Sequence, residues 1–173
     1  MSFQSTVSAQ QGFGVVGDIF DDGPLRAQPF TLRTVSAANN VFGRAFTIVS
    51  EGIASAGQPG SQVFAGILVS PKEHALVGNG LAPSLTLPNE TVATLLSVGS
   101  FVAALPANAN IGDVVYFTNA TGVLTTTAPG AAAPANSTLI RGAYVDRFTP
   151  TAVAGYTLAV VTLTPISRAS APA

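Results

Sequence analysis

The sequence predicts an all-β protein, a barrel or sandwich of about eight to ten short, mostly antiparallel strands with extended terminal arms. Short segments rich in β-branched and aromatic residues, which suit a pleated sheet, recur along the chain. Clusters of Gly, Pro, Asn and Asp separate them at fairly even spacing, and no segment has the period of a convincing amphipathic helix. The 173 residues are long enough for one substantial core, so we expect a single β-rich domain over residues 1–173.

The clearest unit is a hairpin within residues 112–127, GDVVYFTNATGVLTTT. Residues 114–118 place β-branched or aromatic side chains on both faces of an extended segment, which indicates a strand buried on both sides. Residues 119–122 supply turn formers, and we expect Gly122 at a positive φ. The return strand is predicted at residues 123–127.

Further strands are predicted on either side of this hairpin. Pro29 indicates an edge strand, and residues 41–50 and 63–70 are expected to form an antiparallel pair with a long loop. The segment from Glu90 to Leu105 is interpreted as two short strands joined at residues 97–100, although Asn89 leaves a capped helix as an alternative. The predicted strands are residues 27–33, 41–50, 63–70, 82–87, 101–105, 139–148 and 156–164.

The chain carries few charges. Charged residues make up 9% of it, against roughly 25% in ordinary soluble domains, and hydrophobic residues make up 47%. A net charge of -1 supplies no cationic field for a nucleic acid and no basic block for an anionic membrane, so we expect neither partner. A neutral surface favours association, so we expect other subunits to cover much of it. A monomer coated in Ser, Thr, Asn and Gln is the alternative.

No motif supports catalysis or a cofactor. The pattern Gly12 to Gly17 matches a dinucleotide fingerprint but lacks the preceding strand and the following helix. Asp18, Asp21 and Asp22 are interpreted as a solvated turn, since they lack the spacing of a calcium loop. His74 is the single histidine, and the chain has no cysteine. We expect no enzyme activity, no cofactor and no metal.

The termini show no targeting signal. Residues 1–11 lack a basic region and an apolar region, and the longest apolar run, Phe101 to Leu105, is far shorter than a membrane span. We therefore expect the protein to be made and used in the soluble phase. Residues 165–173 are predicted to form a mobile tail.

Several segments together resemble a known family. They are FQSTVSAQQGFGVVGDIFDDGP (3–24), NVFGRAFTIVS (40–50), VFAGILVSP (63–71), LAPSLTL (81–87) and IGDVVYFTNATGVLTT (111–126). Their order and spacing resemble the structural cement, or capsid decoration, proteins of tailed bacteriophages. The resemblance implies a β-rich protein, made in the cytoplasm of a bacterial host, that binds the outside of a shell of major capsid protein and reinforces it. It also implies a homo-oligomer, often a trimer near local threefold positions.

We expect residues 1–11 to act as an arm that reaches a neighbouring subunit, with a disordered tail as the alternative. The candidate interface residues are Phe3, Val7, Gln10 and Gln11. Two other functions stay open at this point. A carbohydrate- or receptor-binding module of a tail fibre or adhesin is disfavoured because the chain has no Trp and three Tyr to stack on sugars. A hydrolase using converging carboxylates would require a cleft.

Overall fold

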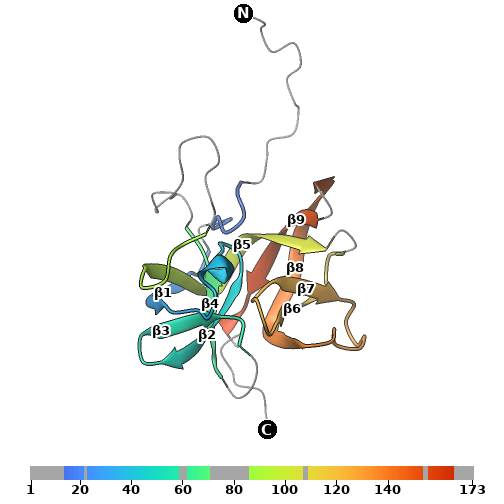
Figure 1. Ribbon diagram of the computed structural model, residues 1–173. Helices are drawn as coiled ribbons and strands as arrows, with labels where there is room; N and C mark the ends of the chain where they lie inside the picture. The colour runs from blue at the N-terminus through green and yellow to red at the C-terminus, as the bar shows by residue number, and fades with distance from the viewer. Residues whose placement is uncertain are drawn as a thin grey trace, which may run out of the picture.

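The computed structural model describes residues 14–21, 23–58, 62–70, 86–106, 109–153 and 156–165, with the backbone alone described at 148–153. Within these ranges the chain forms nine strands, one 3-10 turn and no α-helix, so the predicted all-β class is confirmed (Figure 1). The strands are β1 (Arg26–Leu32), β2 (Ala45–Ser50), β3 (Ile53–Ala56), β4 (Phe64–Leu68), β5 (Val92–Pro106), β6 (Val114–Thr118), β7 (Leu124–Thr127), β8 (Ser137–Val153) and β9 (Tyr156–Leu163).

The first five strands close into a barrel. They pair in the order β1-β3-β2-β4-β5, and β5 pairs with β1 to complete the ring. The β1–β3 pair is parallel and the others are antiparallel. The barrel is closed, so the prediction of an edge strand at residues 27–33 was wrong: β1 pairs with β3 and with β5, and Thr31 has a partner on each. Pro29 lies where β5 alone is in register with β1, so its missing N–H breaks no ladder with β3.

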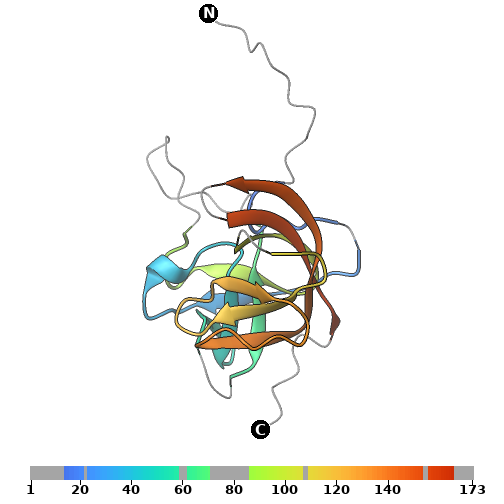
Figure 2. The same cartoon turned by 90° about the vertical axis from the view of Figure 1, so that its right-hand side faces the viewer.

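The long strand β5 joins the barrel to a second sheet. Its first half pairs with β1 and β4, and its second half, from Gly99 to Pro106, pairs with β9. The second sheet then continues β9-β8-β6-β7, with β8 and β9 as a long curved ribbon (Figure 2). Gly99 has φ 124, and a Cβ there would lie 2.5 Å from Leu25 Cδ2. The segment predicted as two short strands therefore forms one strand, β5. The joint predicted at residues 97–100 is the place where β5 changes its pairing partners.

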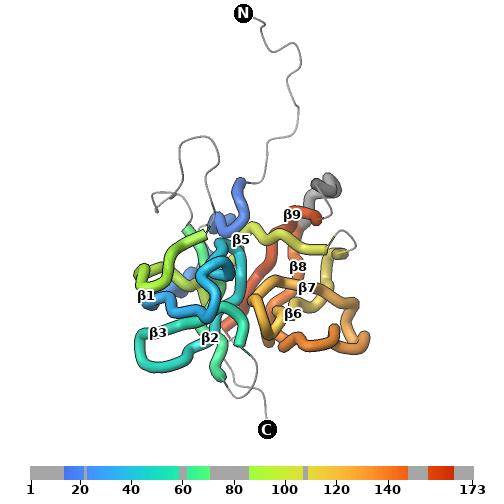
Figure 3. Tube along the Cα trace, in the orientation of Figure 1, coloured from blue at the N-terminus to red at the C-terminus, as the bar shows by residue number. Residues whose placement is uncertain are grey.

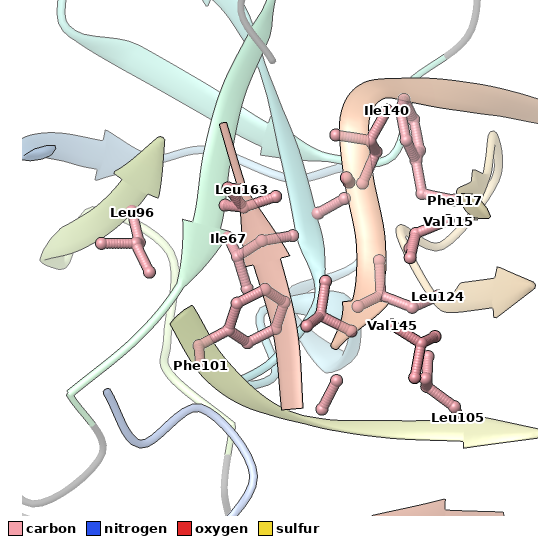
Figure 4. Close-up of a cluster of buried hydrophobic side chains, with 14 of the residues drawn as sticks. Ile67, Leu96, Phe101, Leu105, Val115, Phe117, Leu124, Ile140, Val145 and Leu163 are labelled. Carbon is pink, nitrogen blue, oxygen red and sulfur yellow. The ribbon is translucent and has the colours of Figure 1, made fainter. Parts of the chain in front are cut away.

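Two hydrophobic cores share the barrel wall. Neighbouring residues on one strand enter different cores, as Phe46 and Ala45 do on β2 and Leu95 and Leu96 do on β5. The first core holds side chains from all five barrel strands, including Phe46 and Leu95, and fills the barrel. The second lies between the barrel and the outer sheet (Figure 4). Strands β2, β4 and β5 have apolar residues on both faces because each separates the two cores.

Other predicted strands are confirmed with shifted boundaries. The hairpin is β6 and β7, and the C-terminal pair is β8 and β9. The antiparallel pairing of β2 with β4 is confirmed, but β3 was missed inside the predicted loop. Of the predicted strand 82–87, residues 82–85 lie outside the described ranges, and Thr86 bridges Val41. Figure 3 shows the path of the chain through both sheets.

The turn between β6 and β7 is fastened to the barrel by backbone hydrogen bonds. Ala45 N donates to Gly122 O at 2.8 Å, Gly57 N donates to Ala45 O at 3.0 Å, and Gln58 N donates to Asn119 O at 2.6 Å. Gly122 has φ 72, which confirms its predicted positive φ, and Gly57 has φ 67. A Cβ would lie 2.3 Å from Ala45 O at Gly122 and 2.5 Å from Asn119 O at Gly57. We call these three hydrogen bonds, together with Gly57 and Gly122, the glycine latch.

A polar cluster is buried beside the barrel core. Asn40 is fully buried, and its Nδ2 donates to Asn89 Oδ1 at 2.9 Å. Asn89 also bonds both the N–H and the C=O of Thr34, at 3.1 and 2.8 Å. The Thr34 hydroxyl accepts from Ala56 N at 3.0 Å and donates to Asn40 Oδ1 at 2.5 Å. The cluster satisfies these side chains internally, as burial requires.

Candidate capsid-contact surface

The predicted arm falls outside the described residues. Phe3, Val7, Gln10 and Gln11 all precede Gly14, where the description of the chain begins. The chain that follows is held on β5: Gly17 N donates to Val102 O at 2.8 Å, and Phe20 N donates to Ser100 O at 2.9 Å. The N-terminal segment therefore enters the fold as a strand-like addition to the free edge of β5.

The described part of the glycine pattern has a packing role. Gly17 has φ 89, and a Cβ there would lie 2.9 Å from Phe42 Cβ and 3.2 Å from Leu68 O. No helix follows it, so its N–H points at β5 and not toward an anion site. The glycine is required by close packing of this segment against the barrel.

The acidic cluster is only partly as predicted. Asp21 is exposed and accepts from Gly23 N at 3.2 Å, in the manner of a turn. Asp18, expected to be solvated, is buried, and its carboxylate accepts from Val15 N at 2.9 Å. The prediction was wrong there because Asp18 lies in the segment that docks on β5. Asp22 and His74 lie outside the described residues.

The outer face of β6 and β8 carries an apolar and aromatic surface. Val114 pairs with Tyr144, and Tyr116 pairs with Leu139. Cross-strand partners share a face, so these four side chains lie opposite the core residues of the same strands. Leu139 is 44% exposed and Tyr144 is 38% exposed, while Tyr116 is buried. We call these four residues the outer-sheet patch.

Much of the chain around this patch is free of charge, although Arg141 lies on β8 between Leu139 and Tyr144. Residues 114–140 contain no Lys, Arg, His, Asp or Glu. The loop from β7 to β8 is mostly exposed and consists largely of Ala, Pro and Gly. The charge-free run is visible in the sequence, and it is the signal by which the surface could have been predicted. Protein interfaces have cores that are depleted in charge and enriched in Tyr, so this composition suits protein contact.

Three charged groups near this region make contacts within the fold. Asp113 is buried, and its carboxylate accepts from Asn110 N at 2.9 Å. Arg147 lies over the ring of Phe20, 5.5 Å from its centroid, in a cation–π contact. Arg44 donates to Asn39 Oδ1 at 2.8 Å, and its burial lowers its pKa.

A metal-binding group and a membrane-spanning helix are both absent from the described residues. In the described ranges, no three His, Cys, Asp or Glu side chains gather in a group that could hold a metal ion. Nor does that part of the chain contain a helix long and apolar enough to cross a membrane. The surface offers apolar area, tyrosine hydroxyls and backbone amides, which are the means of protein recognition.

Comparisons with known proteins identify the family of the chain. Residues 3–164 match the family model described as "Structural cement protein (E217 gp24/Pam3 gp6)". The fold is similar to a chain in the structure "The capsid of Myoviridae Phage XM1", with a TM-score of 0.62 and 16% sequence identity, over 95% of this chain and 99% of that one. A comparison with curated proteins finds no match. The chain belongs to the phage structural cement protein family, and it is a structural component of a bacteriophage capsid and not an enzyme.

Proposed function

We propose that this protein binds the outer surface of the capsid and stabilises the shell by bridging neighbouring subunits of the major capsid protein. The observation that carries this proposal is the outer-sheet patch, three of whose four residues lie in the charge-free run 114–140. A surface of this kind binds by burying apolar area, at roughly 25 cal/mol per Å². The tyrosines add hydrogen bonds and rigid contact area, as they do at interface hot spots. Because the family assigns the chain to the capsid, the alternative of a tail-fibre module is not carried further.

The proposed unit on the capsid is a homo-oligomer, with a trimer as the expected form. A trimer places the same patch on several neighbouring capsid subunits at once. After one copy binds, the others bind at a high effective concentration, so each contact can be modest. A ligand that binds the assembled shell and not its free subunits also shifts the assembly equilibrium toward the shell by mass action.

The patch is tested by two tyrosines of equal exposure. Tyr144 and Tyr156 are each 38% exposed, but Tyr156 lies on β9 outside the patch. We expect Tyr144→Ala to lower occupancy on capsids that lack the decoration protein by about tenfold or more, as loss of a hot-spot side chain does. Tyr156→Ala is the control and should bind normally. Occupancy is measured by quantitative gel analysis of purified particles, and equal binding by the two variants would exclude the patch as the contact.

The introduction of charge gives an independent test of the same face. Leu139→Asp places a carboxylate in the patch, where docking would remove it from water at a cost of several kcal/mol. We expect no detectable occupancy, with the melting temperature of the free protein close to that of the wild type because Leu139 is partly exposed. Failure of the wild-type protein to bind capsids or to raise their rupture temperature would overturn the proposed function as a whole.

The arm is tested by deletion. Protein lacking residues 2–11 keeps every described residue, so its fold should be unchanged. If the arm reaches a neighbour, occupancy and thermal rupture temperature of the decorated capsid both fall. If both are unchanged, the arm has no role in binding, while the assignment of the patch stands.

A further inference from the structure

An exposed ion pair lies on the outer face of the barrel. Arg33 Nε donates to Glu90 Oε1 at 2.9 Å, and Arg33 Nη2 donates to Glu90 Oε2 at 3.1 Å. The two side chains are 59% and 60% exposed. The pair is bidentate, which fixes the relative orientation of the two charges. It uses two of the five N–H donors of a guanidinium group.

The backbone at this pair is unusual for an exposed site. Glu90 has φ 65, in the left-handed region that favours glycine. Glu90 N donates to Leu32 O at 2.8 Å, which holds this conformation, whereas the exposed ion pair itself contributes little to stability. Residues held in such conformations are concentrated at sites of function. The geometry orients one positive and one negative group toward solvent.

An exposed valine lies two positions after each residue of the ion pair, Val35 after Arg33 and Val92 after Glu90. Val35 and Val92 are 94% and 60% exposed, the two highest values among large hydrophobic side chains in the described part of the chain. The register places Thr31 between Val92 on β5 and Ile53 on β3. Glu51, in the turn beside Ile53, is a further charged group near this face. We call Arg33, Glu90, Val35 and Val92 the ion-pair patch.

We propose that the ion-pair patch is a twofold contact with a second copy of this chain. A surface with one cation and one anion side by side is complementary to itself after a twofold rotation. Arg33 of one copy then faces Glu90 of the other, and the four charges alternate in a ring. The valines of the two copies cover one another around the ring. Closed twofold contacts of this isologous kind are the commonest among homo-oligomers.

This contact is separate from the outer-sheet patch. The ion-pair patch lies on the segment that follows β1, the turn that precedes β5 and the first residue of β5, whereas the outer-sheet patch lies on β6 and β8. A copy could therefore hold the capsid with one surface and another copy with the other. Because a twofold contact joins copies in pairs, it would link one trimer to the next and would not build the trimer itself. The inference concerns self-association of the free protein, so its failure would leave the proposed capsid binding untouched.

Charge exchange tests the proposal. Arg33→Glu leaves two acids in the patch and Glu90→Arg leaves two bases, so each variant should lose concentration-dependent self-association by about tenfold or more, as like-charge juxtaposition predicts. An equimolar mixture of the two should associate again, because each supplies the charge that the other lacks. The double variant Arg33→Glu/Glu90→Arg should associate with itself and not with the wild type. Sedimentation velocity over a series of concentrations measures each case.

The remaining outcomes overturn the proposal. Wild-type protein with no concentration-dependent association, or single variants that associate as the wild type does, would exclude the contact. Loss of capsid binding by both single variants with self-association unchanged would assign the patch to the capsid protein instead. Far-ultraviolet circular dichroism and the melting temperature confirm that each variant is folded.

Discussion

Substitution of Gly122 tests whether the glycine latch holds the outer hairpin to the barrel. Gly122→Ala adds a Cβ that would lie 2.3 Å from Ala45 O and 2.9 Å from Gly57 N, both backbone atoms. Gly52 is a matched control, since its φ of 70 is close to the 72 of Gly122 and nothing lies within 4 Å of its Cβ position. The two substitutions share the strain of a positive φ and the effect on the unfolded chain, and they differ in the steric contact.

The expected loss of unfolding free energy is the sum of the strain of a positive φ and the cost of the steric contact. A left-handed alanine costs about 1 to 2 kcal/mol, which should be the whole effect of Gly52→Ala. At Gly122, displacement of the turn adds about 1 to 3 kcal/mol, the usual cost of forcing extra atoms into a packed site. The hydrogen bond from Ala45 N to Gly122 O would also be strained. Gly122→Ala should thus cost about 2 to 5 kcal/mol in total.

Urea denaturation measures the difference. With a slope of about 1 to 3 kcal/mol per M, the midpoint of Gly122→Ala should lie about 1 M below that of Gly52→Ala. Gly57→Ala, on the other side of the latch, should behave like Gly122→Ala, because its Cβ would lie 2.5 Å from Asn119 O. Equal midpoints for Gly122→Ala and Gly52→Ala would show that the close approach does not contribute to stability.

Three further predictions concern the polar cluster, the ion pair and ligands. Asn40→Ala should cost about 1 to 3 kcal/mol in urea titrations, since it removes the acceptor of the buried Thr34 hydroxyl and one donor to Asn89; a neutral effect would contradict this. The hydrogen bond from Arg33 lowers the pKa of Glu90, so the pair's small contribution to stability is present above the ordinary Glu range, about pH 4.3, and is lost as pH falls through the lowered value. Glu90→Gln should remove this dependence between about pH 5 and pH 2, whereas an unchanged slope would assign it elsewhere. Calorimetry and elemental analysis should detect neither NAD nor zinc binding, despite the pattern at residues 12–17.

Local sequence determined the class of the fold and much of its strand content. The β6–β7 hairpin follows from two runs of β-formers around a glycine turn, and Gly122 has the positive φ that the turn requires. Strands β2, β4 and β5 have apolar residues on both faces because each separates the two cores. Strand β6 was predicted to be buried on both sides, but it packs one face on a core and carries part of the outer-sheet patch on the other. The family resemblance, carried by the order of several such units, is confirmed by the match over residues 3–164.

Only the tertiary structure decided how these strands close. Pro29 indicates an edge from local chemistry alone, but β1 has partners on both sides because β3 and β5 reach it from distant parts of the chain. The polar residues at 97–100 suggested a break, yet β5 continues and changes partner at Gly99. Pairing of this kind depends on which strand edges meet, and no single segment contains that information.

The outer-sheet patch and the ion-pair patch likewise depend partly on the sequence and partly on the tertiary structure. The charge-free run at residues 114–140 is a property of the sequence, and it predicts a neutral surface wherever that run lies. That Tyr144 and Leu139 share its exposed face depends on the register between β6 and β8, which contains an irregularity that local periodicity does not predict. Arg33 and Glu90 are separated by 57 positions along the chain and meet because β1 pairs with β5. Composition therefore determined the kind of surface, and strand pairing decided which residues form it.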